Sequence, residues 1–203
     1  MNKNLETDFL LSAYASGYFP MPESQTEEIK WYFPEPRAIL PLEGFHCSRT
    51  LSRTLRRGEY QVSYDKNFVG VMKACAARKD TWINKEFIKA YTKLHELGFA
   101  HSVEVWCEKT LVGGLYGVSI GGAFFAESKF HEKTDASKVA LYFLVQELKK
   151  RGFGLLEVQF LTPHLKSLGV IEVSSIEYLK ILKKRVIESQ KWGDNSLRLE
   201  PKK

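Results

Sequence analysis

The sequence predicts an α+β fold, a mixed β-sheet with flanking helices, and two patterns carry this prediction. Three apolar or alternating segments, 102–107, 111–120 and 123–128, are separated by turns at 108–109 and 121–122 and are typical of an antiparallel meander. A helical pattern over 136–151 and a further strand pattern over 155–161 follow. Strands in a row, a long helix and another strand are typical of a mixed sheet, and we expect a right-handed crossover at the helix.

Local signals predict the remaining elements. Pro and aromatic residues crowd the first 36 positions, so we expect a short helix over 5–16 and then irregular extended chain. The chain therefore divides into a cap, 1–36, and one main domain, 37–203. We expect further strands over 38–42 and 60–64, and further helices over 49–57, 67–77, 85–97, 163–168 and 175–187. Ser48 and Asp135 are predicted N-caps, and Gly58 is predicted to end a helix.

Composition excludes several classes of protein. With 203 residues, 44% hydrophobic and 27% charged, the chain can bury one full core and is neither disordered, collagen-like nor a coiled coil. No apolar run approaches ~20 residues, and the apolar patch at 9–15 follows Glu6 and Asp8, so we expect neither a membrane span nor a signal peptide. Three scattered cysteines predict no zinc site, no disulfide framework and a cytoplasmic protein.

The charge balance is moderately basic, with a formal net charge of +6. Ordinary solubility and a polyanionic partner such as RNA both account for it. Four arginines fall on one side of the predicted helix over 49–57, opposite Leu51, and these are Arg49, Arg53, Arg56 and Arg57. Such a stripe suits a phosphate backbone, and a solvated helix face is the alternative.

Two acidic positions could carry chemistry. Glu157 and Gln159 alternate on one face of a predicted strand, where burial is costly unless both are hydrogen-bonded. Glu127 ends an aromatic strand, where burial could raise its pKa. Ordinary solvated strand positions are the alternative for all three residues.

The run 149–154, Lys-Lys-Arg-Gly-Phe-Gly, is superficially similar to the pyrophosphate loop of acetyl-CoA-dependent transferases. Such a loop opens a helix, whereas this run follows one and is explained by C-terminal capping. The sequence therefore argues against an acetyl-CoA enzyme. The glycine pairs at 113–114 and 121–122 are interpreted as turns or close backbone approaches.

An ordered series of segments between about Ser12 and Leu182 resembles the leucyl/phenylalanyl-tRNA–protein transferases. The segments are Pro-Glu-Pro-Arg-Ala-Ile-Leu (34–40), Phe-His-Cys-Ser-Arg (45–49), Thr-Trp-Ile (81–83), Ala-Tyr-Thr-Lys-Leu-His-Glu-Leu-Gly (90–98), Ala-His-Ser-Val-Glu-Val-Trp (100–106), Leu-Val-Gly-Gly-Leu-Tyr-Gly-Val (111–118), Ala-Glu-Ser-Lys-Phe (126–130), Ala-Ser-Lys (136–138) and Ser-Leu-Gly (167–169). The resemblance implies an acetyltransferase-like (GNAT-like) domain. It also implies transfer of Leu or Phe from aminoacyl-tRNA to a protein N-terminus, which creates a degradation signal.

The resemblance also implies roles for individual residues. Gln159, Glu157 and Glu127 match catalytic positions. Trp82 matches an aromatic residue that stacks on the terminal adenosine, and Tyr14, Tyr91 and Met21 match positions near it. The donor side-chain pocket would be lined by Leu115, Phe124, Lys129, Leu141, Leu144, Leu148 and Leu156. Several of these leucines also form one helix face, so core packing is their alternative.

Three positions depart from the family pattern. Glu157 replaces Asp, Met21 replaces Trp, and Lys129 replaces an apolar Met, so we expect Lys129 to pair with Glu127 or Glu157 or to contact a substrate carboxylate. The last option predicts acceptors that begin with Asp or Glu.

For the reaction, we expect Glu157 to orient Gln159, whose carbonyl oxygen would accept a hydrogen bond from the attacking amine. Aminoacyl-tRNA is then a substrate and no cofactor is needed, and we expect a monomer. A small-molecule N-acyltransferase and a non-catalytic tRNA-binding module are the competing classes.

Overall fold

The computed structural model describes residues 5–22, 28–78, 81–190 and 192, and its centre is a seven-stranded sheet of order β4-β5-β6-β7-β8-β3-β9. Every neighbouring pair in this sheet is antiparallel except β7 and β8, which are parallel. The strands are β3 (Arg37–Ile39), β4 (Gln61–Tyr64), β5 (Ala100–Cys107), β6 (Thr110–Ile120), β7 (Ala123–His131), β8 (Leu155–Gln159) and β9 (Ile171–Val173). The predicted mixed sheet and its meander, β5-β6-β7, are confirmed.

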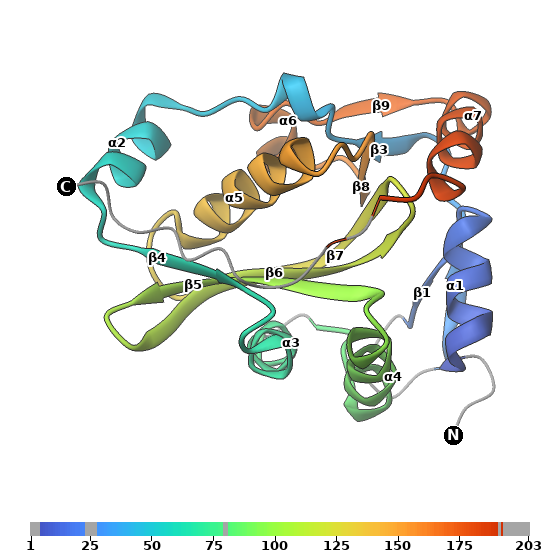
Figure 1. The fold of residues 1–203 in the computed structure, drawn as a ribbon, viewed down its shortest axis with the longest axis horizontal. Coiled ribbons are helices and arrows are strands. Elements are labelled where there is room, and N and C mark those ends of the chain that lie inside the picture. Colours follow the sequence, from blue (N-terminus) through green and yellow to red (C-terminus); the bar gives the residue numbers. More distant parts are fainter. Residues whose placement is uncertain (1–4, 23–27, 79–80, 191, 193–203) are drawn as a thin grey trace.

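Helices cover both faces of the sheet (Figure 1). Helices α3 (Phe68–Ala76) and α4 (Lys85–Glu96) lie on one face, and α5 (Ala136–Lys150), α2 (Arg49–Arg57) and α6 (Pro163–Ser167) lie on the other. Two core clusters correspond to these faces: Phe125 and Phe130 belong to the cluster with α3 and α4, and Phe124 belongs to the cluster with α5. No helix among the described residues is long and apolar enough to span a membrane.

Capping residues set most helix boundaries close to their predicted positions. The Ser48 hydroxyl accepts a hydrogen bond from the Leu51 amide at 3.2 Å, and Gly58 ends α2 in the left-handed region with φ 67°. The predicted side-chain cap by Asp135 is wrong. Asp135 precedes α5 with φ 63°, and its carboxylate instead pairs with Lys138 at 2.8 Å and accepts a hydrogen bond from Thr54 at 3.2 Å.

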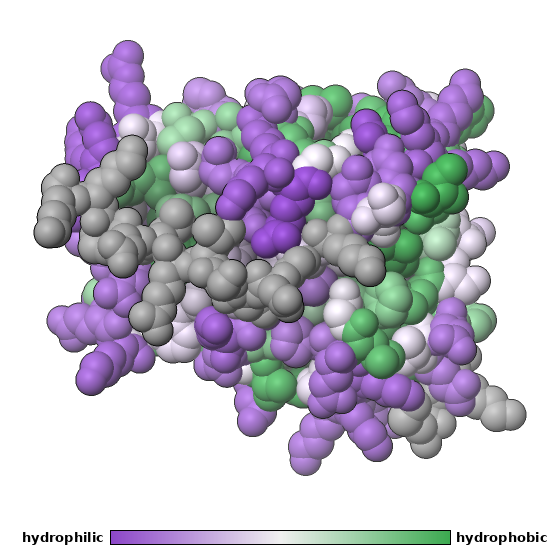
Figure 2. All heavy atoms as spheres, in the orientation of Figure 1, coloured by the Kyte–Doolittle hydropathy of each residue, from purple (hydrophilic) through white to green (hydrophobic). Residues whose placement is uncertain are grey.

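The N-terminal segment is more regular than its proline content predicts. After α1 (Thr7–Ala15), β1 (Phe19–Met21) and β2 (Lys30–Tyr32) form a separate two-stranded antiparallel sheet instead of irregular chain. Helix α1 lies beside α7 (Ser175–Val186) at one end of the molecule (Figure 1). Figure 2 shows apolar side chains gathered on this end of the face it draws. Residue 37 begins the strand that joins the large sheet, and residues 193–203 of the predicted main domain lie outside the described residues.

Strands β7 and β8 pair over only three residues each, 123–125 with 155–157. Glu127 and Gln159 come just beyond this pairing, one on each strand. The predicted strand over 155–161 ends early, because Gln159 adopts φ 68° and leaves the extended conformation. The divergence of the two parallel strands therefore positions the candidate site.

Inside β6, Gly113 and Gly114 are strand residues and do not form the turn that glycine pairs often mark. A Cβ on Gly113 would lie 2.5 Å from the Cβ of Ala136 in the first turn of α5. This glycine therefore serves close packing of α5 on the sheet.

Candidate functional site

A β-bulge places Glu127 in the site. Tyr116 of β6 faces Ser128 and Gly117 faces Ala126, so Glu127 has no partner across the strand pair. A side chain on Gly117 would collide with the carbonyl oxygen of Phe125, so glycine fits the residue facing the bulge. The bulge aims the Glu127 carboxylate at α1 and α4, which supply Tyr14 and Tyr91.

Burial makes the Glu127 carboxyl a weak acid. Its side chain is 7% exposed, and burial is the main reason that its pKa is raised to about 8. The hydrogen bond from Tyr14 lowers this pKa, the negative charge of Glu157 raises it, and hydrogen bonds from Tyr91 and Gln159 lower it. Near neutral pH, Glu127 can therefore exist in either protonation state.

Gln159 connects the two acids through different parts of its structure. Its side-chain Nε2 donates to Glu127 Oε1 at 3.2 Å, while its backbone N–H donates to Glu157 Oε1 at 2.8 Å. Glu157 therefore orients Gln159 through the main chain, and the side-chain amide is oriented by Glu127. Since the NH2 group faces Glu127, the amide carbonyl oxygen is the end of Gln159 that can accept a hydrogen bond from a substrate.

A buried arginine, to which the sequence patterns assigned no role, neutralises Glu157. Arg37 and Glu157 are each 1% exposed, and Arg37 Nη2 lies 3.0 Å from Glu157 Oε1. Arg37 also donates to the Gly17 carbonyl at 2.6 Å and to the Tyr178 hydroxyl at 3.1 Å. Burial raises the pKa of Glu157 and the Arg37 charge opposes that rise.

The sequence signal for Arg37 was available. A cation begins the apolar segment 37–40, so a buried counter-charge could have been expected. This guanidinium lies 4.2 Å from the centre of the Tyr178 ring, 5.4 Å from that of Phe19 and 5.5 Å from that of Phe33. It thus joins the N-terminal segment to the sheet.

The aromatic residues near the site fall into two groups. Tyr14 and Tyr91 are fully buried, and their hydroxyls form a hydrogen bond with each other beside Glu127. Trp82, just before α4, is half-buried and meets the Phe87 ring edge-to-face at 5.0 Å, and Met21 in β1 is half-buried too. Only the second group offers surface to a nucleobase as the structure stands.

The predicted donor pocket is closed in this structure. Its apolar members are each at most 3% exposed and belong to the cluster under α5: Leu115, Phe124, Leu141, Leu144, Leu148 and Leu156. Their arrangement is that of ordinary core packing, so their role as a pocket stays a prediction.

Lys129 lies on the opposite face of β7 from Glu127. It faces Leu115 across the strand pair and alternates with Ser128 and Phe130, which lie on the α3 side. Among the described residues it has no acidic partner, so the expected pairing with Glu127 or Glu157 is wrong. The pKa of Lys129 is lowered to about 8, mainly by burial and in smaller part by the charges of Arg78 and Lys138.

The four arginines of α2 are exposed and lie away from Glu127, at the end of the molecule opposite α1 (Figure 1). Leu51 on the other side of the helix is fully buried, as predicted. The Thr54–Asp135 hydrogen bond and a 2.8 Å bond from the Tyr60 hydroxyl to the Thr134 carbonyl join this region to the start of α5. Arg49, Arg53, Arg56 and Arg57 therefore form an open surface beside α5.

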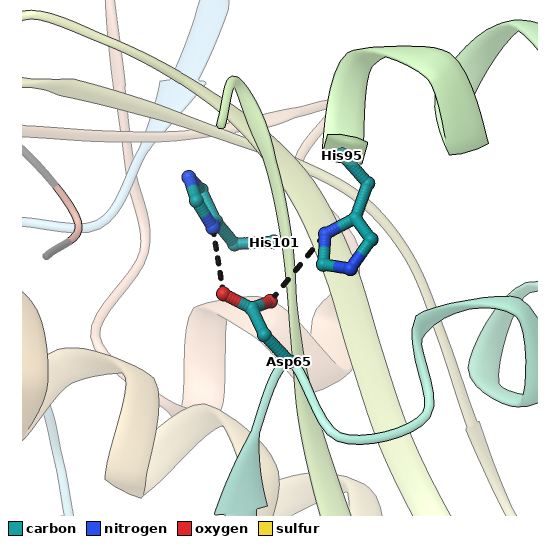
Figure 3. Close-up of side chains that lie close together, drawn as sticks. All are labelled: Asp65, His95 and His101. Carbon is teal, nitrogen blue, oxygen red and sulfur yellow. Dashed lines mark hydrogen bonds and ion pairs between the residues drawn. The ribbon is translucent and has the colours of Figure 1, made fainter. Parts of the chain in front are cut away.

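A second polar cluster joins β4, α4 and β5 and consists of Asp65, His95 and His101 (Figure 3). Its ligand atoms all lie within 4.8 Å of one another, the spacing of a metal site. However, His101 faces Asp65 at 2.8 Å through Nδ1 and the Gly98 carbonyl at 3.1 Å through Nε2, while His95 Nδ1 faces the Ala100 carbonyl at 2.8 Å. These nitrogens face acceptors within the protein, so hydrogen-bonded packing explains the cluster.

With this geometry in place, comparisons with known proteins identify the family. The family model "Leucyl/phenylalanyl-tRNA protein transferase" matches residues 39–183, and the model of that family's N-terminal domain matches residues 3–35. This chain belongs to the leucyl/phenylalanyl-tRNA–protein transferase family. It is therefore an aminoacyltransferase, and the Glu127–Gln159 centre lies within the matched part.

Similar proteins agree with this assignment. A transferase of this name from Ruegeria pomeroyi is 50% identical over 182 residues, which cover 89% of this chain and 87% of the relative. One from Cereibacter sphaeroides is 54% identical over 170 residues, 83% of this chain and 79% of the relative. Among solved structures, FemX superposes with a TM-score of 0.53 at 12% identity and covers 83% of this chain and 66% of FemX, which supports the predicted fold class alone.

Proposed function

We propose that this protein transfers a Leu- or Phe-type aminoacyl group from aminoacyl-tRNA to the α-amino group of a protein N-terminus. The observation that supports this most is the Gln159–Glu127 contact, at the point where β7 and β8 diverge. The amine nitrogen forms a bond to the ester carbonyl carbon, and the bond from that carbon to the ribose oxygen breaks. The ester is already activated, so the reaction requires no cofactor.

Proton transfer is the task of the two side chains. An α-amine has a reference pKa of about 7.7–8.0 and must be neutral to attack. Glu127, with a pKa of about 8, is matched to accept protons from this nitrogen: the ammonium proton passes on to water, and the proton that the nitrogen loses as the amide forms is delivered to the departing ribose oxygen. The Gln159 carbonyl oxygen accepts a hydrogen bond from the neutral amine and orients its lone pair.

The remaining contacts are assigned by position. Trp82 and Met21 hold the terminal adenosine, since their half-buried side chains offer surface to a base, whereas Tyr14 and Tyr91 are fully buried. Stacking on Trp82 would contribute about 1–3 kcal/mol. The exposed arginines of α2 bind the tRNA backbone. The modified protein then carries a new N-terminal residue as a degradation signal, and the enzyme acts as a monomer in the cytoplasm.

The acceptor is proposed to begin with Asp or Glu. The observation that favours this is Lys129, a partly buried cation on the α5 side of β7 with no acidic partner in the described part of the chain. A carboxylate on the first side chain of the acceptor would supply that partner.

One transfer assay tests the main proposal. Charged tRNAs with Leu or Phe are mixed with peptides that differ in their first residue, and labelled peptide is counted. Gln159→Ala should lower kcat by about 10²-fold or more with unchanged tRNA affinity, because a positioned polar group is removed. The control is Gln61→Ala, an exposed residue of β4. Full transfer by Gln159→Ala would refute the mechanism, and tRNA binding without any transfer by the wild type would identify a non-catalytic tRNA-binding module.

The acceptor proposal is tested in the same assay with peptides beginning with Arg, Lys, Asp and Glu. Lys129→Met should reduce transfer to Asp and Glu peptides selectively. A preference for Arg and Lys that Lys129→Met leaves unchanged would exclude the acidic acceptors.

A further inference from the structure

Both acids of the reaction centre are reached from the end of α1, one of them through Arg37. The Tyr14 hydroxyl, in the last turn of α1, forms a hydrogen bond with Glu127. The Gly17 carbonyl, just after this helix, accepts a hydrogen bond from Arg37 Nη1 at 2.6 Å. The other terminal nitrogen of Arg37, Nη2, lies 3.0 Å from Glu157 Oε1. The N-terminal segment is therefore joined to Glu127 directly and to Glu157 by way of Arg37.

One oxygen atom links this arginine to Gln159. Glu157 Oε1 faces Arg37 Nη2 and also accepts the backbone N–H of Gln159 at 2.8 Å. Both donors converge on this atom, so the place where Glu157 holds the Gln159 main chain depends on where Arg37 holds the carboxylate. A guanidinium is a planar, rigid fork of donors, and it fixes a carboxylate more precisely than a single ammonium group does.

The main chain of Gln159 needs such a contact. Its φ of 68° lies in the left-handed region, which costs free energy for a residue with a side chain. Neighbouring residues of β3, at positions 38 and 39, face residues of β8 that are two positions apart, so Val158 is left without a partner. Irregular backbone of this kind persists only where surrounding contacts hold it. Here it turns the Gln159 side chain to Glu127, with Nε2 3.2 Å from Oε1.

Arg37 has little freedom to move. Its side chain is 1% exposed, and its guanidinium lies against the rings of Phe19 in β1, Phe33 and Tyr178 in α7. The Tyr178 hydroxyl also accepts a hydrogen bond from Nη2 at 3.1 Å. Burying an arginine and a glutamate costs free energy that apolar residues of the same volume would not cost. Stability alone therefore gives no reason for the pair, whereas control of the Gln159 backbone does.

We infer that Arg37 is a positioning residue of the transfer reaction: through Glu157 it holds the Gln159 main chain in the conformation that directs the side-chain amide to Glu127. This inference rests on the proposed function, because it takes Gln159 as the group that orients the attacking amine. Since the N-terminal segment holds the guanidinium, docking of that segment is a condition for an assembled reaction centre.

A double-mutant cycle on kcat tests whether Arg37 acts through Gln159. Arg37→Met should lower kcat by about 10- to 100-fold, because a small displacement of a reacting group has an effect of this size. In the Gln159→Ala background the same substitution should lower kcat no further, since the group that it positions is already gone. KM for aminoacyl-tRNA should stay nearly constant. Loosening of the N-terminal segment would instead raise this KM, because Met21 of β1 is proposed to hold the adenosine.

Two further variants separate this effect from misfolding, with every rate expressed per folded protein. Arg151→Met is the matched control, because it removes the ion-pair partner of another buried acid, Glu147 in α5. It should lower the free energy of unfolding and leave kcat unchanged. Arg37→Lys keeps a positive charge beside Glu157 and serves if Arg37→Met does not fold. Its single ammonium cannot reproduce the fork, so it should show part of the kcat loss and the same dependence on Gln159.

Hydrogen exchange of the Gln159 backbone amide gives a readout that needs no substrate. Measured by NMR, this amide should exchange about tenfold faster or more in Arg37→Met and Arg37→Lys than in the wild type, because its acceptor is no longer fixed. The Asn67 amide, which donates to the buried Glu104 at 3.3 Å, is the internal control and should keep its wild-type rate. A general loss of stability would accelerate both amides alike.

Three results would overturn the inference. The first is an equal kcat loss from Arg37→Met in the wild-type and Gln159→Ala backgrounds. The second is wild-type kcat in Arg37→Met, or in Arg37→Lys if only that variant folds. The third is exchange of the Gln159 amide that rises no more than exchange of the Asn67 amide. Absence of transfer by the wild type, with selectively faster Gln159 exchange in the variants, would instead refute the proposed function.

Discussion

Replacing Glu127 with Gln should change how the stability of this protein depends on pH. The carboxyl has a pKa of about 8 in the folded protein, mainly because of burial, against a reference value of 4.5. The folded state therefore holds a proton that the unfolded state has already released between these two values. Stability that is fully present below pH 4.5 is lost as the pH rises through about 8.

The magnitude follows from the two pKa values. Each unit of difference corresponds to about 1.36 kcal/mol, so the full loss above pH 8 is about 5 kcal/mol. Between pH 5 and pH 7 the loss from this one group is about 2–3 kcal/mol. The amide introduced by Glu127→Gln cannot ionise, so the variant should lack this part of the pH dependence. The glutamine can still form hydrogen bonds with Tyr14, Tyr91 and Gln159, with an NH2 group in place of one carboxylate oxygen.

Urea unfolding at pH 5, 6 and 7 measures the effect. The quantity of interest is the difference between wild type and variant, because burial raises the pKa of Glu157 and Glu104 as well, and both remain in the variant. Glu172→Gln, at an exposed position of β9, is the matched control and should leave the slope unchanged. Parallel curves for wild type and Glu127→Gln would refute the assignment of a raised pKa to Glu127.

Three further changes test other parts of the structure. Arg37→Met should destabilise the protein by about 3–5 kcal/mol, because Glu157 is then buried and uncompensated. Urea unfolding measures this loss. Arg37→Met/Glu157→Met should recover much of the loss, and the absence of any recovery would show that the two side chains do not interact. Lys129→Met should raise the stability of the protein at pH 7 by about 1–3 kcal/mol. It should also remove the increase of stability that the wild type shows between pH 8 and 10.5. Equal stability of wild type and variant at pH 7 would contradict an uncompensated charge on Lys129. Asp65→Ala should cost about 1–3 kcal/mol by removing the acceptor of His101, and added zinc should leave the Tm of the wild type unchanged, so a zinc-dependent rise would identify a metal site.

The sequence allowed the frame of the fold to be predicted because its signals are local. Ser48 and Gly58 set both ends of α2, and the turns at 108–109 and 121–122 divide the meander. Asp135 is the exception, since a capping residue type stands at the right place but its carboxylate is held by Lys138. Competition between partners for one side chain depends on tertiary neighbours that no local pattern contains.

The structure brings three of the predicted site residues together, whereas Arg37 and the contacts among these side chains were not predicted. Glu127, Glu157 and Gln159 were selected by family resemblance and strand alternation. Strand alternation alone predicts that Lys129 lies on the same face of β7 as Glu127. This is wrong, because the bulge in β7 shifts every later residue to the other face. The main-chain contact of Glu157 depends on the left-handed conformation of Gln159, which this residue type rarely adopts. Both features are backbone irregularities without a sequence signature of their own.

The bulge at Glu127 has a consequence for how this enzyme can vary. In a regular strand, positions 127 and 129 would share one environment, and a new charge at 129 would act directly on the acid at 127. Here Glu127 is itself the extra residue of the bulge, so Lys129 lies on the α5 side of the sheet, and a mutation at position 129 can alter that side while the hydrogen bonds of Glu127 stay as they are. Selection can therefore change the side chain at position 129 on one face of the strand without disturbing the contacts of the carboxyl at position 127 on the other.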